Sequence, residues 1–117
     1  MEYTCINVTR VDSVTVVRFT ESHILNEMYI QRCGRELLCL VDVERTHQVL
    51  LSFEGVKFLS SIILSKLLTL NKKIKAQQGQ LVLCDMDPEV EDLFSLTNLS
   101  RLFDIRDTQT EALATFS

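Results

Sequence analysis

The sequence predicts an α/β fold in a single domain that spans residues 1–117. Short apolar runs typical of strands alternate along the chain with longer segments whose apolar side chains recur every three or four residues, as in amphipathic helices. Only three glycines and one proline occur, and no stretch has the composition of a linker. With 46% hydrophobic and 24% charged residues, the chain has the composition of a compact domain with its own core.

The N-terminal part is expected to form a hairpin, a helix and a buried strand. The runs YTCINVT and SVTVVRFT alternate in polarity and are separated by residues 10–12, which predicts a β-hairpin. Residues 26–43 have helical spacing of apolar side chains. The run Val49-Leu50-Leu51 is continuous, so it predicts a strand that is buried on both faces of a sheet.

Strands and helices continue to alternate in the second half. Residues 61–77 form an expected helix that Gly79 ends, and LVLC is the next buried strand. Asp87-Pro88 supplies an N-cap and a first-turn proline for a third helix.

The C-terminal segment completes the pattern. The run LFDI is a short expected strand, and Thr108 with Glu111 forms a capping-box pattern before the last helix. The alternation of strands and helices along the chain indicates a mixed sheet with a parallel portion.

The helix that begins after FLSS presents one polar side. Its core face is formed by Ile63, Leu64, Leu67, Leu70 and Ile74, which fall within an arc of about 120°. The opposite, solvent-facing side carries Ser61, Ile62, Ser65, Thr69 and Lys72. Ser60 is expected to cap the helix through its hydroxyl oxygen, which leaves the Ser61 hydroxyl accessible to a partner or a kinase.

Composition argues against several functional classes. The net charge is −4, and the lysines of residues 72–75 are explained by the dipole of a helix C-terminus, so nucleic acid is not an expected partner. No apolar stretch is long enough for a membrane span, which predicts a soluble cytoplasmic protein. The four cysteines lack a C-x-x-C pair and are expected to be free thiols, mostly buried, in a reducing compartment.

Catalysis and cofactor binding are not expected. His23 and His47 have no nucleophile placed beside them by the sequence, and no phosphate-binding loop, dinucleotide-binding pattern or serine elbow occurs. An aspartyl-phosphate receiver is a weak alternative, because Asp85 and Asp87 follow a buried strand and could bind Mg²⁺. A receiver site also needs acidic residues at the end of the first strand, where only Glu21 occurs, and dipole effects at a helix start adequately explain the acids of residues 87–92.

The order of several short motifs resembles the STAS domain family of anti-sigma factor antagonists. The similar pieces are Val56 to Leu59, the Ser61 position, Gly79 to Leu83, Leu99 to Ile105 and Thr108 to Leu113. With the N-terminal hairpin and first helix in the expected order, the resemblance covers nearly the whole chain. It implies a small mixed β-sheet with four helices packed mainly on one face.

The resemblance also implies a function in bacterial transcription regulation. The position of Ser61 is where such proteins are phosphorylated by a partner serine kinase that doubles as an anti-sigma factor. The unphosphorylated chain would bind this partner and release a sigma factor. Partner contacts are expected at Ser60, Ser61, Ile62, Ser65, Thr69 and Lys72, in a monomer or weak homodimer.

A second interpretation stays within the same family. Ser60 stands where the family pattern has aspartate, and Ile62-Ile63 replaces its Ser-Gly pair. These departures favour a STAS module that binds constitutively, in a scaffold or a transporter-associated complex, without phosphoregulation. The intact serine at position 61 favours the switch.

Overall fold

The computed structural model describes residues 2–116 and shows a mixed β-sheet as the centre of the fold. Five strands lie in the order β1-β2-β4-β6-β7, with β1 antiparallel to β2 and the other neighbours parallel. Their bounds are Ile6–Val11 (β1), Val14–Phe19 (β2), Gln48–Ser52 (β4), Gln80–Cys84 (β6) and Asp104–Arg106 (β7). The mixed sheet with its parallel portion confirms the predicted fold class.

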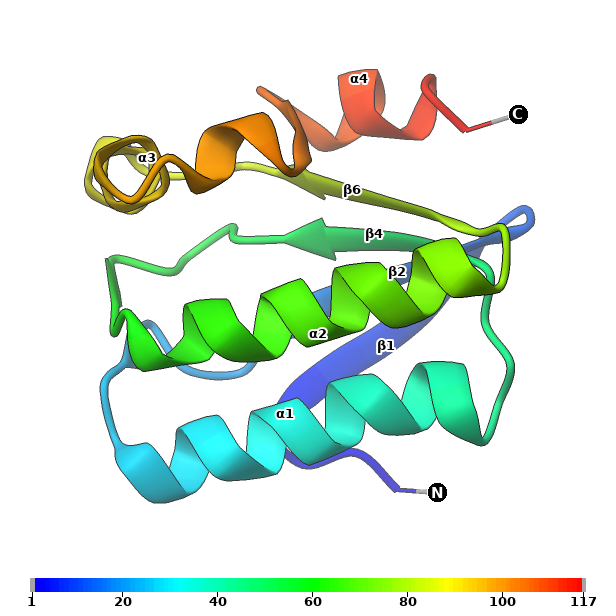
Figure 1. Cartoon of the computed structure of the whole chain (residues 1–117), viewed down its shortest axis with the longest axis horizontal. Coiled ribbons are helices and arrows are strands. Elements are labelled where there is room, and N and C mark those ends of the chain that lie inside the picture. Colours follow the sequence, from blue (N-terminus) through cyan, green and yellow to red (C-terminus); the bar gives the residue numbers. More distant parts are fainter. Residues whose placement is uncertain (1, 117) are drawn as a thin grey trace.

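Helices cover both faces of this sheet, but most of them lie on one. The helices are α1 (Glu27–Asp42), α2 (Ile62–Ala76), α3 (Pro88–Leu96) and α4 (Gln109–Leu113), with a 3₁₀ turn η1 at Leu99–Arg101. Figure 1 shows α1 and α2 side by side in front of the sheet, beginning at one end of the molecule and ending at the other. The short α4 packs on the opposite face, against β4, β6 and β7.

The central strands are buried from both sides, as their continuous apolar runs predict. Val49 and Leu51 of β4 point into the large core under α1, α2 and α3, whereas Leu50 points into the smaller core under α4. Strand β6 repeats the arrangement, with Leu83 in the large core and Val82 in the small one. Because side chains alternate along a strand, helices on both faces require apolar residues at every position.

The hairpin extends further toward its turn than expected. Arg10 and Val11 belong to β1 and pair with Thr15 and Val14, so the predicted three-residue connection was wrong. The chain reverses directly after Val11 because Asp12 adopts a left-handed backbone conformation with φ 56°. Aspartate tolerates this conformation better than most residues, which permits the tight connection.

The end of α2 also differs from expectation in one detail. The left-handed residue is Gln78, with φ 60°, rather than Gly79. The Gly79 amide donates to the Ile74 carbonyl at 2.8 Å and the Gln78 amide donates to the Lys75 carbonyl at 2.9 Å, which together form a Schellman motif. Gly79 is needed for a different reason: a Cβ there would lie 2.2 Å from the His47 carbonyl oxygen.

The C-terminal elements follow their sequence signals. Thr108 caps α4 by accepting a hydrogen bond from the Glu111 amide at 3.1 Å. Pro88 begins α3 as predicted, but the Asp87 side chain makes no capping bond and pairs with the Lys57 ammonium at 3.0 Å. The expected strand at residues 102–105 begins two residues later and ends one residue later, at Arg106, because the turn of η1 precedes it.

All four cysteines are free, and three of them are buried. Cys5, Cys33 and Cys84 lie in the core, while Cys39 is partly exposed. Burial raises the pKa of the Cys84 thiol to about 12, and the neighbouring Asp85 carboxylate adds to this effect. A thiol with such a pKa stays protonated near neutral pH and packs as a small apolar side chain.

A buried carboxylate on α1 fastens the N-terminal segment to the core. Glu36 is 3% exposed, and its Oε1 accepts hydrogen bonds from the backbone amides of Thr4 and Cys5 at 3.0 and 2.9 Å. Its Oε2 accepts one from the Thr4 hydroxyl at 2.9 Å. Burial alone would raise the pKa of Glu36, but these hydrogen bonds outweigh burial and lower it.

We therefore expect Glu36→Gln to destabilise the protein by about 1–3 kcal/mol at neutral pH, because the amide group cannot accept all of these bonds. A carboxyl whose pKa is lowered by folding stabilises the folded state above its unfolded pKa, and this contribution disappears as the pH falls through the folded pKa. The difference between the two proteins should accordingly shrink as the pH falls below about 4.3, the ordinary pKa of a glutamate side chain. Urea unfolding at several pH values measures it, and Glu2→Gln, at an exposed position, is the matched control.

Candidate functional site

A small second sheet holds the segment that leads to the serines. Strands β3 (His23–Ile24) and β5 (Phe58–Leu59) pair in parallel, which no local pattern had predicted. The Lys57 amide donates to the Ser22 carbonyl at 2.7 Å, and the Ser60 amide donates to the Ile24 carbonyl at 2.9 Å. The chain therefore enters α2 from a fixed direction.

The two serines divide their roles much as expected, although the helix boundary lies one residue later. Ser61 occupies the N-cap position, but its backbone is already helical and its hydroxyl makes no capping bond. The Ser60 hydroxyl oxygen instead accepts a hydrogen bond from the Ile62 amide at 3.3 Å. Ser60 thus satisfies a first-turn donor while the Ser61 side chain is exposed to solvent.

The predicted polar side of α2 is exposed along its length. Ser61, Ser65, Thr69 and Lys72 are all exposed, and Ile62 is 47% exposed. The hydroxyls of Ser65 and Thr69 donate back to the carbonyls of Ile62 and Ser65, at 2.9 and 3.1 Å. Ser61 is the first hydroxyl of this surface, and its side chain makes no hydrogen bond within the described residues. The predicted core face, formed by Ile63, Leu64, Leu67, Leu70 and Ile74, is buried.

The structure also has an apolar groove beside the serines, which the sequence did not predict. It has a volume of about 280 Å³ and lies between β5 and α3, with Leu25, Phe58, Leu59, Leu93 and Leu96 in its walls. Leu96 is 83% exposed and Leu25 is 56% exposed. Glu89 and Asp92 add two negative charges to its lining and Lys57 adds one positive charge. Since Phe58 and Leu59 lead directly into Ser60, this groove is continuous with the start of α2.

The carboxylates that suggested a receiver domain have partners within the fold. Asp85 accepts hydrogen bonds from the Ser52 hydroxyl at 2.8 Å and from the Cys84 thiol at 3.3 Å, and Asp87 pairs with Lys57. Within residues 2–116, no three side chains of the types that bind metals come together. The same residues include no helix that is both long and apolar enough to cross a membrane.

Comparisons with known proteins identify a family and a similar sequence. The STAS domain family model matches residues 6–112. A putative anti-sigma factor antagonist, BtrV of Bordetella bronchiseptica, is 27% identical over 93 residues, which cover 80% of this chain and 79% of BtrV.

Solved structures show the same fold. An anti-sigma-factor antagonist (STAS) domain protein from Planctomyces limnophilus is 28% identical, with a TM-score of 0.84 over 93% of this chain and 95% of that one. A putative anti-sigma factor antagonist from Thermotoga maritima is 24% identical, with a TM-score of 0.79 over 93% of this chain and 92% of the other.

Proposed function

Because the chain belongs to the STAS domain family, we propose that it is an anti-sigma factor antagonist that binds an anti-sigma factor and so releases a sigma factor. The observation that carries this proposal is the accessible Ser61 hydroxyl at the start of α2, on a fold shared with proteins named as such antagonists. The protein itself acts by binding, and any ATP in the reaction belongs to its partner.

The same hydroxyl supports regulation by phosphorylation. Phosphorylation at Ser61 would add a charge of about −1.5 to −2 to the centre of the binding surface. The positive end of the α2 dipole tolerates an anion, so the modified chain remains folded. An interface that closes over an uncharged hydroxyl is opposed by the phosphate and its hydration shell, which makes modification a switch for binding.

The exposed polar side of α2 and the adjacent groove together form the proposed binding surface. Ser60, Ser61, Ile62, Ser65, Thr69 and Lys72 make up its helical part. Phe58 and Ile62 supply apolar side chains near the serines, with 45% and 47% of their surfaces exposed. The acidic residues Glu89 and Asp92 of the groove lining fit a partner segment in which an apolar side chain is flanked by basic residues.

Intact-mass spectrometry of the chain from its native host tests the switch. A species heavier by about 80 Da, with the phosphate mapped to Ser61, is the expected result. Unmodified Ser61 under several growth conditions would instead favour a constitutive STAS binding module. The serine at position 60, where the family pattern has aspartate, is the observation that supports this second candidate.

Alanine at an apolar contact position tests the surface itself. We expect Ile62→Ala to weaken binding to the purified anti-sigma factor about fivefold to thirtyfold, because truncation of a central apolar side chain typically costs about 1–2 kcal/mol. Val43→Ala removes an apolar group that is 70% exposed at the far end of α1 and should leave affinity unchanged. Isothermal titration calorimetry measures both, and equal affinities for the two variants would remove Ile62 from the interface.

A further inference from the structure

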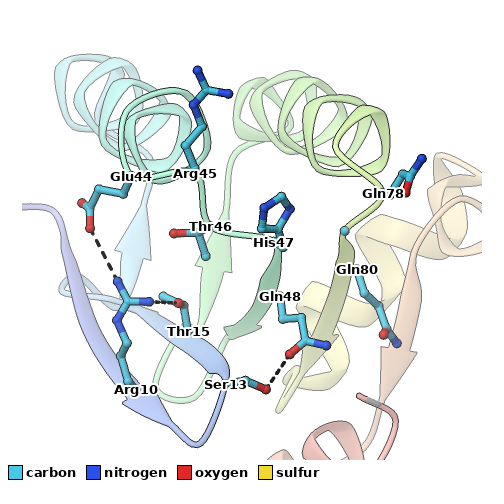
Figure 2. Close-up of a pocket in the computed structure, with 11 residues that line it drawn as sticks. Arg10, Ser13, Thr15, Glu44, Arg45, Thr46, His47, Gln48, Gln78 and Gln80 are labelled. Carbon is cyan, nitrogen blue, oxygen red and sulfur yellow. Dashed lines mark hydrogen bonds and ion pairs between the residues drawn. The ribbon is translucent and has the colours of Figure 1, made fainter.

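A cavity bordered by polar residues lies at the end of the molecule opposite Ser61. It has a volume of about 620 Å³ and is bordered by the segments that follow α1 and α2, the starts of β4 and β6, and the β1–β2 hairpin (Figure 2). Helix α2 runs from Ser61 toward this cavity, so the two sites are separated by about 25 Å along the helix axis. The cavity is therefore distinct from the proposed binding surface.

The side chains that border the cavity all belong to polar or charged residues. Arginine, histidine, glutamine, serine and threonine side chains line it, with Glu44 as the carboxylate and Gly79 as the residue without a side chain. Arg10 donates to the Thr15 hydroxyl at 2.7 Å and lies 3.5 Å from the Glu44 carboxylate, which fixes its guanidinium group (Figure 2). Because a guanidinium has five donor hydrogens, these contacts leave donors for a further acceptor.

Thr46 gives the second, independent indication of a ligand. The residue is only 7% exposed, and its hydroxyl oxygen is buried without a hydrogen-bond partner among the described residues. A buried hydroxyl without a partner lowers stability, so most such groups in proteins are satisfied by protein, water or ligand. Thr46 lines the cavity, where a bound molecule could satisfy the hydroxyl.

Backbone hydrogen bonds connect the segments around the cavity. Arg45 and Gln78 both have left-handed conformations, with φ values of 56° and 60°. The Thr46 amide donates to the Leu40 carbonyl at 2.9 Å, and the Gln80 amide donates to the His47 carbonyl at 2.8 Å. Gln78 takes this conformation because it closes the Schellman motif after α2, and the two hydrogen bonds join the segment before β4 to the end of α1 and to β6.

We propose that this cavity binds a small polar molecule that carries a phosphate or carboxylate group. Arg10 supplies the guanidinium group of this site; Arg45 also borders the cavity, but its side chain points away from Arg10 (Figure 2). Guanidinium groups bind phosphate and carboxylate with paired hydrogen bonds. The hydroxyls and amides of the walls would bind the uncharged part of the ligand. Ligand binding at this site would be a signal to the protein that is separate from phosphorylation of Ser61.

Titration of the ¹⁵N-labelled chain with three probes tests the proposal. The probes are inorganic phosphate, adenosine 5′-monophosphate and citrate, with sodium chloride at matched ionic strength as the reference. We expect saturable shifts of the backbone amides of Arg10, Arg45, Thr46 and Gly79 with at least one probe. Binding of inorganic phosphate or adenosine 5′-monophosphate would indicate recognition of a phosphate group, and binding of citrate would indicate recognition of a carboxylate.

Two variants locate the binding. Arg10→Gln should weaken binding at least tenfold, and Thr46→Val, which keeps the side-chain shape, at least threefold. Arg35→Gln removes the same charge from an exposed position on α1 outside the cavity and should change nothing. The proposal is overturned if no probe gives saturable shifts, or if Arg10→Gln or Thr46→Val binds as tightly as the unmodified chain. Neither result bears on binding of the anti-sigma factor at Ser61.

Discussion

Ser61→Asp is expected to weaken binding to the anti-sigma factor by about 100-fold or more, while Ser61→Ala binds as tightly as the unmodified chain. The aspartate places a charge where the proposed interface closes over a hydroxyl, and a buried charge without a partner typically costs 2–5 kcal/mol. Alanine removes a hydroxyl that makes no capping bond. Only the aspartate therefore imitates the phosphorylated state.

Neither substitution should disturb the fold, which makes the binding result interpretable. The hydrogen bond from the Ile62 amide goes to Ser60 and survives both changes, and an acidic side chain is favourable at a helix N-terminus. Thermal unfolding should show closely similar midpoints for both variants.

Thr110→Asp is the charge-matched control, because α4 lies on the other face of the sheet. Surface plasmon resonance with the immobilised anti-sigma factor compares all of the variants. Equal affinity for Ser61→Asp and Ser61→Ala would contradict the switch, and equal weakening by Thr110→Asp would indicate a general charge effect.

The fold was predictable because its signals are local. The helical spacing from residue 26 to residue 43, the continuous run at Val49 and the Thr108–Glu111 cap each depend on neighbours within one or two turns, and the structure confirms them. The pairing of β3 with β5 joins segments 35 residues apart, His23 with Phe58. Two-residue strands have no period to detect, so nothing in the local sequence indicates that pairing.

The candidate site was predictable only in part, for a similar reason. The exposure of Ser61 and Ile62 follows from the position of each on a single helix, and the structure confirms it. The groove combines Leu25, Phe58 and Leu96 from three separate segments. Leucine and phenylalanine are usually core residues, so the sequence alone does not distinguish these three from the core. Only the tertiary structure shows that they are exposed together.

Gly79→Ala is expected to destabilise the protein by about 2–4 kcal/mol, the largest loss of stability we predict for a single methyl group. The added Cβ would lie 2.2 Å from the His47 carbonyl oxygen and 2.9 Å from the Ile74 side chain. The first contact is with backbone, so no side-chain rotation can relieve it. Strand β6 would have to move away from the segment that leads into β4, and the Gln80 amide bond to the same carbonyl, at 2.8 Å, would lengthen.

Gly34→Ala is the same chemical change with the opposite expectation. Gly34 lies inside α1, and the atoms nearest to its added Cβ would be those of the flexible Lys66 side chain, from 3.0 Å. Alanine favours helix over glycine by about 1 kcal/mol, so this variant should be neutral or up to about 1 kcal/mol more stable. Urea unfolding of both variants measures the contrast. Similar stabilities would mean that the chain around His47 yields easily, whereas the expected contrast shows that the closed turn after α2 holds β6 in register beside β4.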